Sequence, residues 1–279
     1  MRPTCQGVSL SAYQRSCRAL VGVYALCVVL AGCSTVPQSF TPLQPLPAEQ
    51  VSHRLFDEVL RAHVREGVVD YPAIAEDARF KSYLDHLTRV DPNALRTRDD
   101  RLAFWINAYN AFAIQGILDG LSPGTLFGRY EFFIRRRYQV GGGMINLYDL
   151  ERVILIREFK EPRIHFAIVC ASQSCPKLRS EAYVAQRLNA QLEESARAFI
   201  NDSGRNRFDR TRREAKLSKI FDWFDEDFVA RSGSLIGYVK HYVTDETLAQ
   251  ELAAESYSVE FLAYDWNLNG TQPLIARIN

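Results

Sequence analysis

Residues 99–118 contain an apolar stretch with no polar face, and this stretch constrains the fold more than any other segment. Asp99 or Asp100 can cap a helix at its start, and Gly120 follows its end. A helix that is apolar all round must be covered on every side. We therefore predict a buried central helix. Within it, Asn107 and Asn110 lie three residues apart, so we expect both amides on one face.

The segments on either side of this helix predict an α+β fold. Helical spacing or helix-end signals indicate further helices over residues 51–66, from Pro72 to about 91, from 149, over 183–201 and in three short stretches near 222–230, 234–243 and 246–254. Strands are predicted at 137–140 and 144–147 around a glycine turn, at 163–169, in a hairpin over 206–218 and at 259–264. We therefore predict one domain over 51–279, with helices packed around a mainly antiparallel sheet and the central helix buried.

Residues 1–32 have the pattern of a signal peptide. Arginines precede an apolar run of 14 residues, Ala19 to Gly32, which is too short to span a bilayer as a helix. The run ends in Leu30-Ala31-Gly32-Cys33, which resembles the lipobox of bacterial lipoproteins. The resemblance implies that Cys33 carries lipid such as palmitate, and Ser34 implies an outer-membrane protein facing the periplasm. An ordinary signal peptide or a short membrane anchor is the alternative.

The remaining composition limits the partners of the chain. Residues 33–50 hold four prolines and little charge, which predicts a tether after the lipidated cysteine. The chain has 34 Lys and Arg against 33 Asp and Glu; without the three arginines of residues 1–32 the balance is 31 against 33. This balance argues against a nucleic-acid partner. We expect the membrane, through Cys33, and an unknown small-molecule, peptide or protein ligand as partners.

Cys170 and Cys175 are the two thiols expected in the mature domain. In an oxidising envelope they are a disulfide candidate. Pro176 suits a first helical position, which would place Cys175 at a helix N-terminus and lower the pKa of its thiol. Cys175 is then a candidate catalytic nucleophile, with His165 as its base. The strand advances about 13 Å from His165 to Val169, so the following loop would have to double back.

Each candidate residue also has a structural interpretation. His165 is a hydrogen-bonded core residue in that interpretation, and the two asparagines tie the central helix to loop backbone. Otherwise Asn107 and Asn110 line a polar pocket, with Glu151 as a candidate acid. Asp225 and Asp227 are candidate acids or simple helix-end charges. No metal site is predicted, because one histidine and two cysteines lack a fourth ligand, and no cofactor is predicted.

Several of these segments together resemble the domain-of-unknown-function 547 family, DUF547. They are residues 102–110, 149–151, 163–179, 217–228 and 264–269. The resemblance implies no assigned activity. A central helix before a histidine segment is also distantly similar to papain-like and transglutaminase-like hydrolases, but those place the nucleophilic cysteine on that helix, where this chain has Asn107.

Three functional hypotheses follow from the sequence. The favoured one is a lipid-anchored binding or accessory module, with a polar pocket near His165, Asn107 and the 170–176 loop. The alternative is a cysteine hydrolase or acyl or peptide transferase that uses Cys175 and His165. The third is a purely structural interaction protein.

Overall fold

The computed structural model describes residues 36–37, 39–254 and 256–272. The α-helices are α1 (Arg54–His63), α2 (Tyr71–Glu76), α3 (Ala78–Leu87), α4 (Arg98–Leu118), α5 (Leu126–Tyr130), α6 (Leu147–Asp149), α7 (Arg157–Phe159), α8 (Leu188–Ile200), α9 (Lys219–Trp223), α10 (Asp225–Ser232), α11 (Leu235–Val239) and α12 (Glu246–Ala254). Short 3-10 helices are η1 (Ala48–Gln50), η2 (Pro92–Ala94), η5 (Pro162–Phe166) and η6 (Ala185–Arg187), and π-helices are η3 (Glu131–Arg135) and η4 (Leu150–Ile156). The strands are β1 (Val64–Arg65), β2 (Val68–Asp70), β3 (Tyr138–Val140), β4 (Gly143–Ile145), β5 (Arg207–Asp209), β6 (Glu214–Leu217), β7 (Ser258–Phe261) and β8 (Gly270–Thr271).

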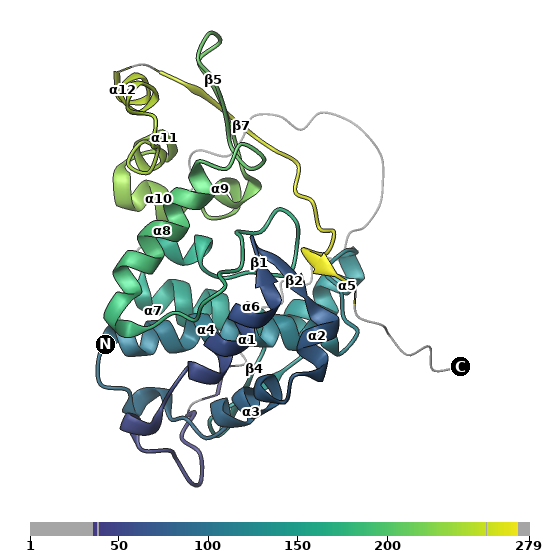
Figure 1. The fold of residues 1–279 in the computed structure, drawn as a ribbon. Helices are drawn as coiled ribbons and strands as arrows, with labels where there is room; N and C mark the ends of the chain where they lie inside the picture. Colours follow the sequence, from purple (N-terminus) through teal and green to yellow (C-terminus); the bar gives the residue numbers. More distant parts are fainter. Residues whose placement is uncertain (1–35, 38, 255, 273–279) are drawn as a thin grey trace, which may run out of the picture. The chain divides into compact units, whose positions relative to one another are not determined.

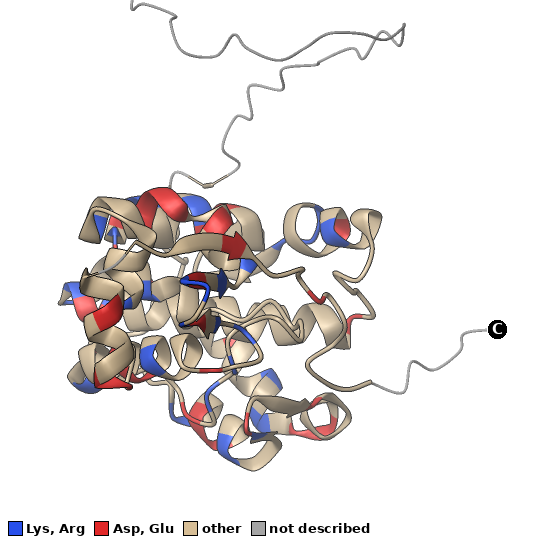
Figure 2. Cartoon of the chain, turned by 90° about the horizontal axis from the view of Figure 1, so that it is seen from above, with Lys and Arg blue, Asp and Glu red and all other residues tan. Residues whose placement is uncertain are grey.

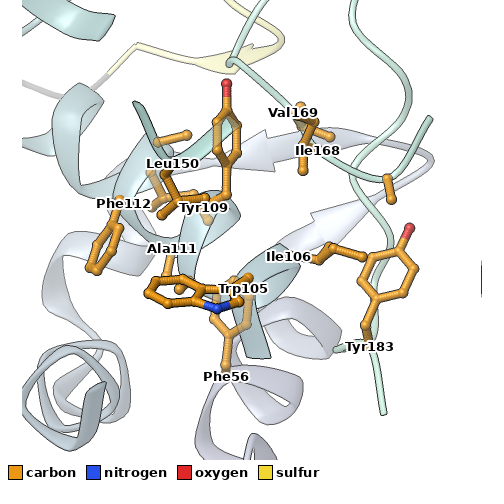
Figure 3. Close-up of a cluster of buried hydrophobic side chains, with 14 of the residues drawn as sticks. Phe56, Trp105, Ile106, Tyr109, Ala111, Phe112, Leu150, Ile168, Val169 and Tyr183 are labelled. Carbon is orange, nitrogen blue, oxygen red and sulfur yellow. The ribbon is translucent and has the colours of Figure 1, made fainter. Parts of the chain in front are cut away.

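The predicted central helix is confirmed as α4, which begins one residue earlier than expected. Its N-cap is Thr97, whose hydroxyl accepts a hydrogen bond from the Asp100 N–H, while the Asp100 carboxylate accepts one from the Thr97 N–H. This reciprocal capping box replaces the predicted aspartate cap. Fifteen of the 21 residues of α4 are buried. Figure 3 shows part of this core, with Phe56 and Trp105 on one side and Leu150 beside Tyr109.

The α+β class is confirmed, with the strands in three small sheets. Strands that are neighbours in sequence pair antiparallel, as β1 with β2, β3 with β4, and β5 with β6. Strands from the C-terminal part join in parallel, β8 beside β2 and β7 beside β6. Figure 1 shows α10–α12 with β5 and β7 at one end, α1–α3 at the other, and α4 between them. The C-terminal segment therefore links both ends.

Two hydrophobic clusters form the interior. The larger surrounds α4 and takes in side chains from residue 40 to residue 192. The smaller is built by α8–α12 and β6 around Phe166, Phe221 and Phe228. Tyr264 packs against both clusters, so the segment after β7 lies at their boundary.

The predicted strand at 163–169 is wrong. Residues 162–166 form η5, which Pro162 begins and which the Glu161 carboxylate caps by accepting a hydrogen bond from the Arg163 N–H (3.2 Å). The segment is apolar on both faces because it is buried on both, and periodicity alone cannot separate this case from a central strand. Side chains of α4 satisfy part of its backbone, as described below.

The N-terminal segment differs from the predicted tether. Phe40 is buried and its ring lies 5.2 Å from that of Trp105. The Phe40 carbonyl accepts a hydrogen bond from the Gly142 N–H (2.7 Å), in the turn between β3 and β4. Gly141 has a φ of +53° and no room for a side chain against this segment. Val36 also packs against the core, so the described chain contacts the domain from residue 36, and Cys33 lies outside the described residues.

None of the helices in the described ranges has the length and hydropathy needed to cross a membrane. Acidic and basic positions are interspersed over the peripheral elements in the view of Figure 2.

Candidate functional site

A cavity of about 300 Å³ brings together several of the predicted site residues. Seven aromatic side chains, four polar or charged ones and two isoleucines line it. They are Tyr109, Phe133, Tyr148, Trp223, Phe224, Tyr264 and Trp266; Glu151, Arg152, His165 and Cys170; and Ile168 and Ile220. Another cavity, of about 440 Å³, lies near His53 and the start of α4. We place the site in the smaller one because a carboxylate, an imidazole and a thiol meet there.

Glu151 comes from η4 and lies largely buried in the wall of this cavity. The Tyr109 hydroxyl donates a hydrogen bond to its carboxylate (3.2 Å), and Figure 3 shows this hydroxyl pointing away from Phe56 and Trp105. Burial raises the pKa of Glu151, while the charge of Arg152 and the Tyr109 hydrogen bond oppose the rise. The Arg152 guanidinium lies over the ring of Phe224, 4.4 Å from its centre.

His165 is buried, and only one of its two ring nitrogens has a hydrogen-bond partner. Its Nε2 lies 2.8 Å from Asp227 Oδ2, and because a carboxylate can only accept, Nε2 carries the proton. The Nδ1 atom has no hydrogen-bond partner within the described part of the chain. The ring packs against Phe224 and Phe228, with centroids 4.0 and 5.3 Å away. Burial lowers the pKa of His165 and Asp227 opposes it, so Nδ1 is an acceptor at neutral pH.

The two thiols occupy different positions. Cys170 lines the cavity, whereas Cys175 is buried and does not appear in the cavity wall. Both are free cysteines in this structure, so the predicted disulfide stays a prediction for the oxidised protein. The Tyr264 hydroxyl lies 3.3 Å from the sulfur of Cys170 and 3.2 Å from that of Cys175.

The thiolate of Cys175 is favoured by hydrogen bonds to its sulfur and not by a helix dipole. No helix begins at Pro176, so the predicted effect of a helix dipole is wrong. Burial raises the pKa of Cys175, but hydrogen bonds from Cys170, Tyr264 and backbone N–H groups outweigh it and lower the pKa to about 7. One of these is the Cys170 N–H, 3.1 Å from the sulfur. The proton is correspondingly held on Cys170, whose pKa is raised.

A C-terminal segment fixes the loop that carries the thiols. Ala171, with a φ of +62°, turns the chain sharply after Cys170. Backbone hydrogen bonds then join residues 171–174 to residues 265–269, including Gln173 N–H to the Asn267 carbonyl (2.7 Å). This pairing places Tyr264 and Trp266 beside Cys170. The sequence predicted a structural corner here, and the corner also supplies part of the cavity wall.

Asn107 and Asn110 are not among the residues that line the cavity. Asn107 donates to the Tyr183 carbonyl (2.8 Å) and accepts from the Tyr183 N–H (2.9 Å). Asn110 donates to the Ala167 carbonyl (3.0 Å) and accepts from the Val169 N–H (2.8 Å). Each amide thus ties α4 to loop backbone, as the structural interpretation expected.

Sequence reasoning missed most of the cavity wall. Arg152, Trp223, Phe224 and Trp266 belong to segments that were predicted as helix ends or as a corner, or that carry the family resemblance, and none of the four was a candidate site residue. Asp225 does not line the cavity, whereas Asp227 contacts it through His165. The clustering of aromatic residues in 221–228 and 264–266 was the available signal. Within the described ranges, no three His, Cys, Asp or Glu side chains are grouped so that they could hold a metal ion.

Comparison with known proteins gives a family and no activity. Residues 92–200 match the family model described as "Protein of unknown function, DUF547". Over these residues the chain is similar to the DUF547 family. The DUF547 match includes α4, Glu151, His165 and both thiols, whereas Trp223, Asp227, Tyr264 and Trp266 come after it. No curated protein and no solved structure matches the chain.

Proposed function

We propose that this protein is a binding module that takes a small ligand into the cavity beside His165 and Cys170. The observation that carries the proposal is the His165 imidazole, buried in the cavity wall with Nδ1 unpartnered. A buried acceptor without a partner is costly, and a ligand donor would satisfy it. The aromatic walls suit an apolar or aromatic body.

The polar groups of the cavity indicate which end of the ligand is bound. His165 Nδ1 accepts hydrogen bonds, and so does the Glu151 carboxylate when it is ionised. His165 and Glu151 both line the cavity, and a ligand with N–H or O–H donors, such as an amine, would satisfy their acceptors. We therefore expect tyramine to bind more tightly than 4-hydroxyphenylpropionate, a matched ligand that carries a carboxylate instead.

Tryptophan fluorescence offers a direct test, because Trp223 and Trp266 both line the cavity. Titration with tyramine should change the emission of the parent protein. The His165→Phe variant keeps an aromatic ring against Phe224 but has no acceptor, so binding should weaken about tenfold, the effect of about 1.4 kcal/mol. The matched control is His86→Phe, outside this cavity. Equal binding by parent and His165→Phe would contradict the proposal.

The location of the protein is part of the same proposal. We propose lipidation at Cys33 and attachment to the outer membrane, with the domain facing the periplasm. The support is the basic segment, the short apolar run and the lipobox-like residues 30–33. Labelled palmitate should enter the parent protein and not Cys33→Ser, and membrane fractionation should place the parent in the outer membrane. Equal labelling of both would refute the lipid anchor.

A second function, acyl or peptide transfer, is favoured by one observation: a thiol and an imidazole with a free Nδ1 line the same cavity. Cys175, the nucleophile predicted from the sequence, does not line it, so the role would pass to Cys170. The Cys170 sulfur would give its proton to His165 Nδ1 and attack a carbonyl carbon, forming a thioester. The leaving group would take that proton, and water would then release the acyl group and restore the thiol.

The two functions separate in a burst experiment with p-nitrophenyl acetate. A transferase should release one equivalent of nitrophenol rapidly and carry acetyl on Cys170, as located by mass spectrometry. Cys170→Ser should abolish the burst and Cys175→Ser should retain it. A pure binding module gives no burst, and both variants should still bind tyramine.

A further inference from the structure

We propose that the outer face of α5 and η3 docks onto an anionic phospholipid bilayer and holds the cavity mouth at the membrane surface. This face, which we call the α5 face, consists of Leu126, Phe127, Tyr130 and Ile134. Their exposed fractions are 80%, 71%, 50% and 43%. Large apolar side chains gathered at such exposure mark an interaction site.

The α5 face has the pattern of an interfacial helix. Its four members occur at intervals of one, three and four residues along one continuous helical segment, so they share a side. Phe132, on the other side, is fully buried and attaches the segment to the core. A helix held in this way presents its apolar side outward, as in proteins that lie on membranes.

The charge around the α5 face fits an anionic surface. Residues 119–137 contain four arginines and two acidic residues, a balance of +2. Two of the arginines form ion pairs within the segment, Arg135 with Glu131 (2.7 Å) and Arg136 with Asp119 (2.6 Å), so the excess positive charge comes from Arg129 and Arg137. Arg129 lies over the ring of Trp266 at 4.7 Å. Basic residues beside apolar ones are attracted to anionic lipid headgroups.

Phe133 of η3, the residue before Ile134, lines the cavity and connects the segment that carries the α5 face to it. The Phe133 ring lies 6.3 Å from Trp266, and Trp266 lies 5.8 Å from Trp223. Trp223 and Tyr148, which line the cavity, are 39% and 49% exposed. Tryptophan and tyrosine at a rim of this kind suit the boundary between headgroups and acyl chains. A ligand could then enter the cavity from the bilayer.

The length of chain before the domain supports the same partner, and this step alone rests on the proposed lipidation of Cys33. Phe40 is buried in the domain, and seven residues span at most about 25 Å. Phe40 bonds the turn between β3 and β4, and β3 follows η3 after two residues. A lipid at Cys33 would therefore hold Phe40, and the domain that buries it, within about 25 Å of the bilayer.

Vesicle sedimentation tests the α5 face without the anchor. The chain from Ser34 contains both hydrophobic clusters and has no lipidation site, so its binding does not depend on Cys33. It should sediment with vesicles of phosphatidylcholine and phosphatidylglycerol, and less with phosphatidylcholine alone. Phe127→Ser should weaken binding on the order of tenfold, the effect of one large apolar side chain. The control Val229→Ser, on α10, should bind like the parent.

Two results would overturn the proposal. One is equal sedimentation of the parent and Phe127→Ser at matched melting temperatures. The other is a dimer in light scattering that Phe127→Ser dissociates, which would assign the α5 face to a second copy of the chain. Absence of palmitate on Cys33, by contrast, would remove the lipid anchor and leave vesicle binding unchanged.

Discussion

The buried polar side chains of α4 and those of the cavity wall differ in how many of their hydrogen-bonding atoms have a partner. The amides of Asn107 and Asn110 each make two hydrogen bonds to backbone, at 2.8 to 3.0 Å. His165, equally buried, uses one ring nitrogen and leaves the other without a partner in the described structure. Both regions lie in the same domain and both were predicted as one pocket. The first region ties α4 to the loop backbone, whereas the second leaves one buried acceptor without a partner in the described residues.

This difference shows why a buried polar residue in a sequence is ambiguous. An amide has a donor and an acceptor side by side, which match a backbone N–H and carbonyl, so an asparagine can be satisfied within the fold. An imidazole that gives its proton to a carboxylate retains an acceptor that the fold must satisfy separately. The described structure leaves that acceptor without a partner, in a residue that lines a cavity. If the contacts determine the response, the two regions should react differently to substitution and to pH.

The largest effect is expected from removing an α4 amide. Asn110→Ala would leave the Ala167 carbonyl and the Val169 N–H without a hydrogen-bond partner. Each loss costs about 1–3 kcal/mol, so the free energy of unfolding should fall by roughly 4 kcal/mol. Asn107→Ala should cost a similar amount through Tyr183. Urea denaturation at pH 7 measures both. A loss below about 1 kcal/mol for either variant would show that these amides are solvated and would break the comparison.

The second prediction concerns pH, because histidines titrate and amides do not. His53 is partly buried and bonds Tyr83 through Nδ1 (2.8 Å). Burial, with a contribution from His86, lowers the pKa of His53 from 6.5 to about 4. Between these values the unfolded chain binds a proton that the folded chain does not, so stability falls as the pH falls, by about 3 kcal/mol.

His53→Asn should flatten this loss between pH 6.5 and 4, as measured by urea denaturation at several pH values. Asn110→Ala should shift the whole curve down and keep its slope. An unchanged slope in His53→Asn would place the acid sensitivity in other histidines, such as His165, whose pKa burial also lowers.

The sequence predicted α4 and its burial because a helix that is apolar all round must be covered on every side. It predicted the turn at 141–143 from its glycines and the hairpin near 206–218 from the alternation of Lys and Arg, and both are local signals. It failed at 163–169, where burial on two sides hides the difference between a strand and a 3-10 turn. It also failed at Cys175, because the groups that bond its sulfur include Tyr264, 89 residues away. The cavity depends on such distant pairings, and no local pattern encodes them.

The third prediction concerns oxidation of the Cys170 thiol in the cavity wall to a disulfide with Cys175. A Cys170–Cys175 bridge would remove both S–H groups and close a loop of few residues. The expected stabilisation is about 2 kcal/mol on the loop-entropy estimate. Melting of oxidised and reduced protein should differ accordingly, and Cys170→Ser and Cys175→Ser should remove the difference. Identical melts in all three proteins would show that no bridge forms.

The smallest effect is expected at Glu151, and it should have the opposite sign to that at Asn110. Because burial raises the pKa of Glu151, the folded chain holds its proton to a higher pH than the unfolded chain does, and folding weakens as the pH rises through that window. Glu151→Gln keeps the shape and carries no charge, so it should raise the melting temperature slightly at pH 8 and lose the advantage at pH 4. Glu226→Gln, an exposed control on α10, should change neither. A lower melting temperature for Glu151→Gln at pH 8 would mean that the carboxylate stabilises the fold, as the α4 amides do. The contrast between the cavity wall and α4 would then fail at Glu151.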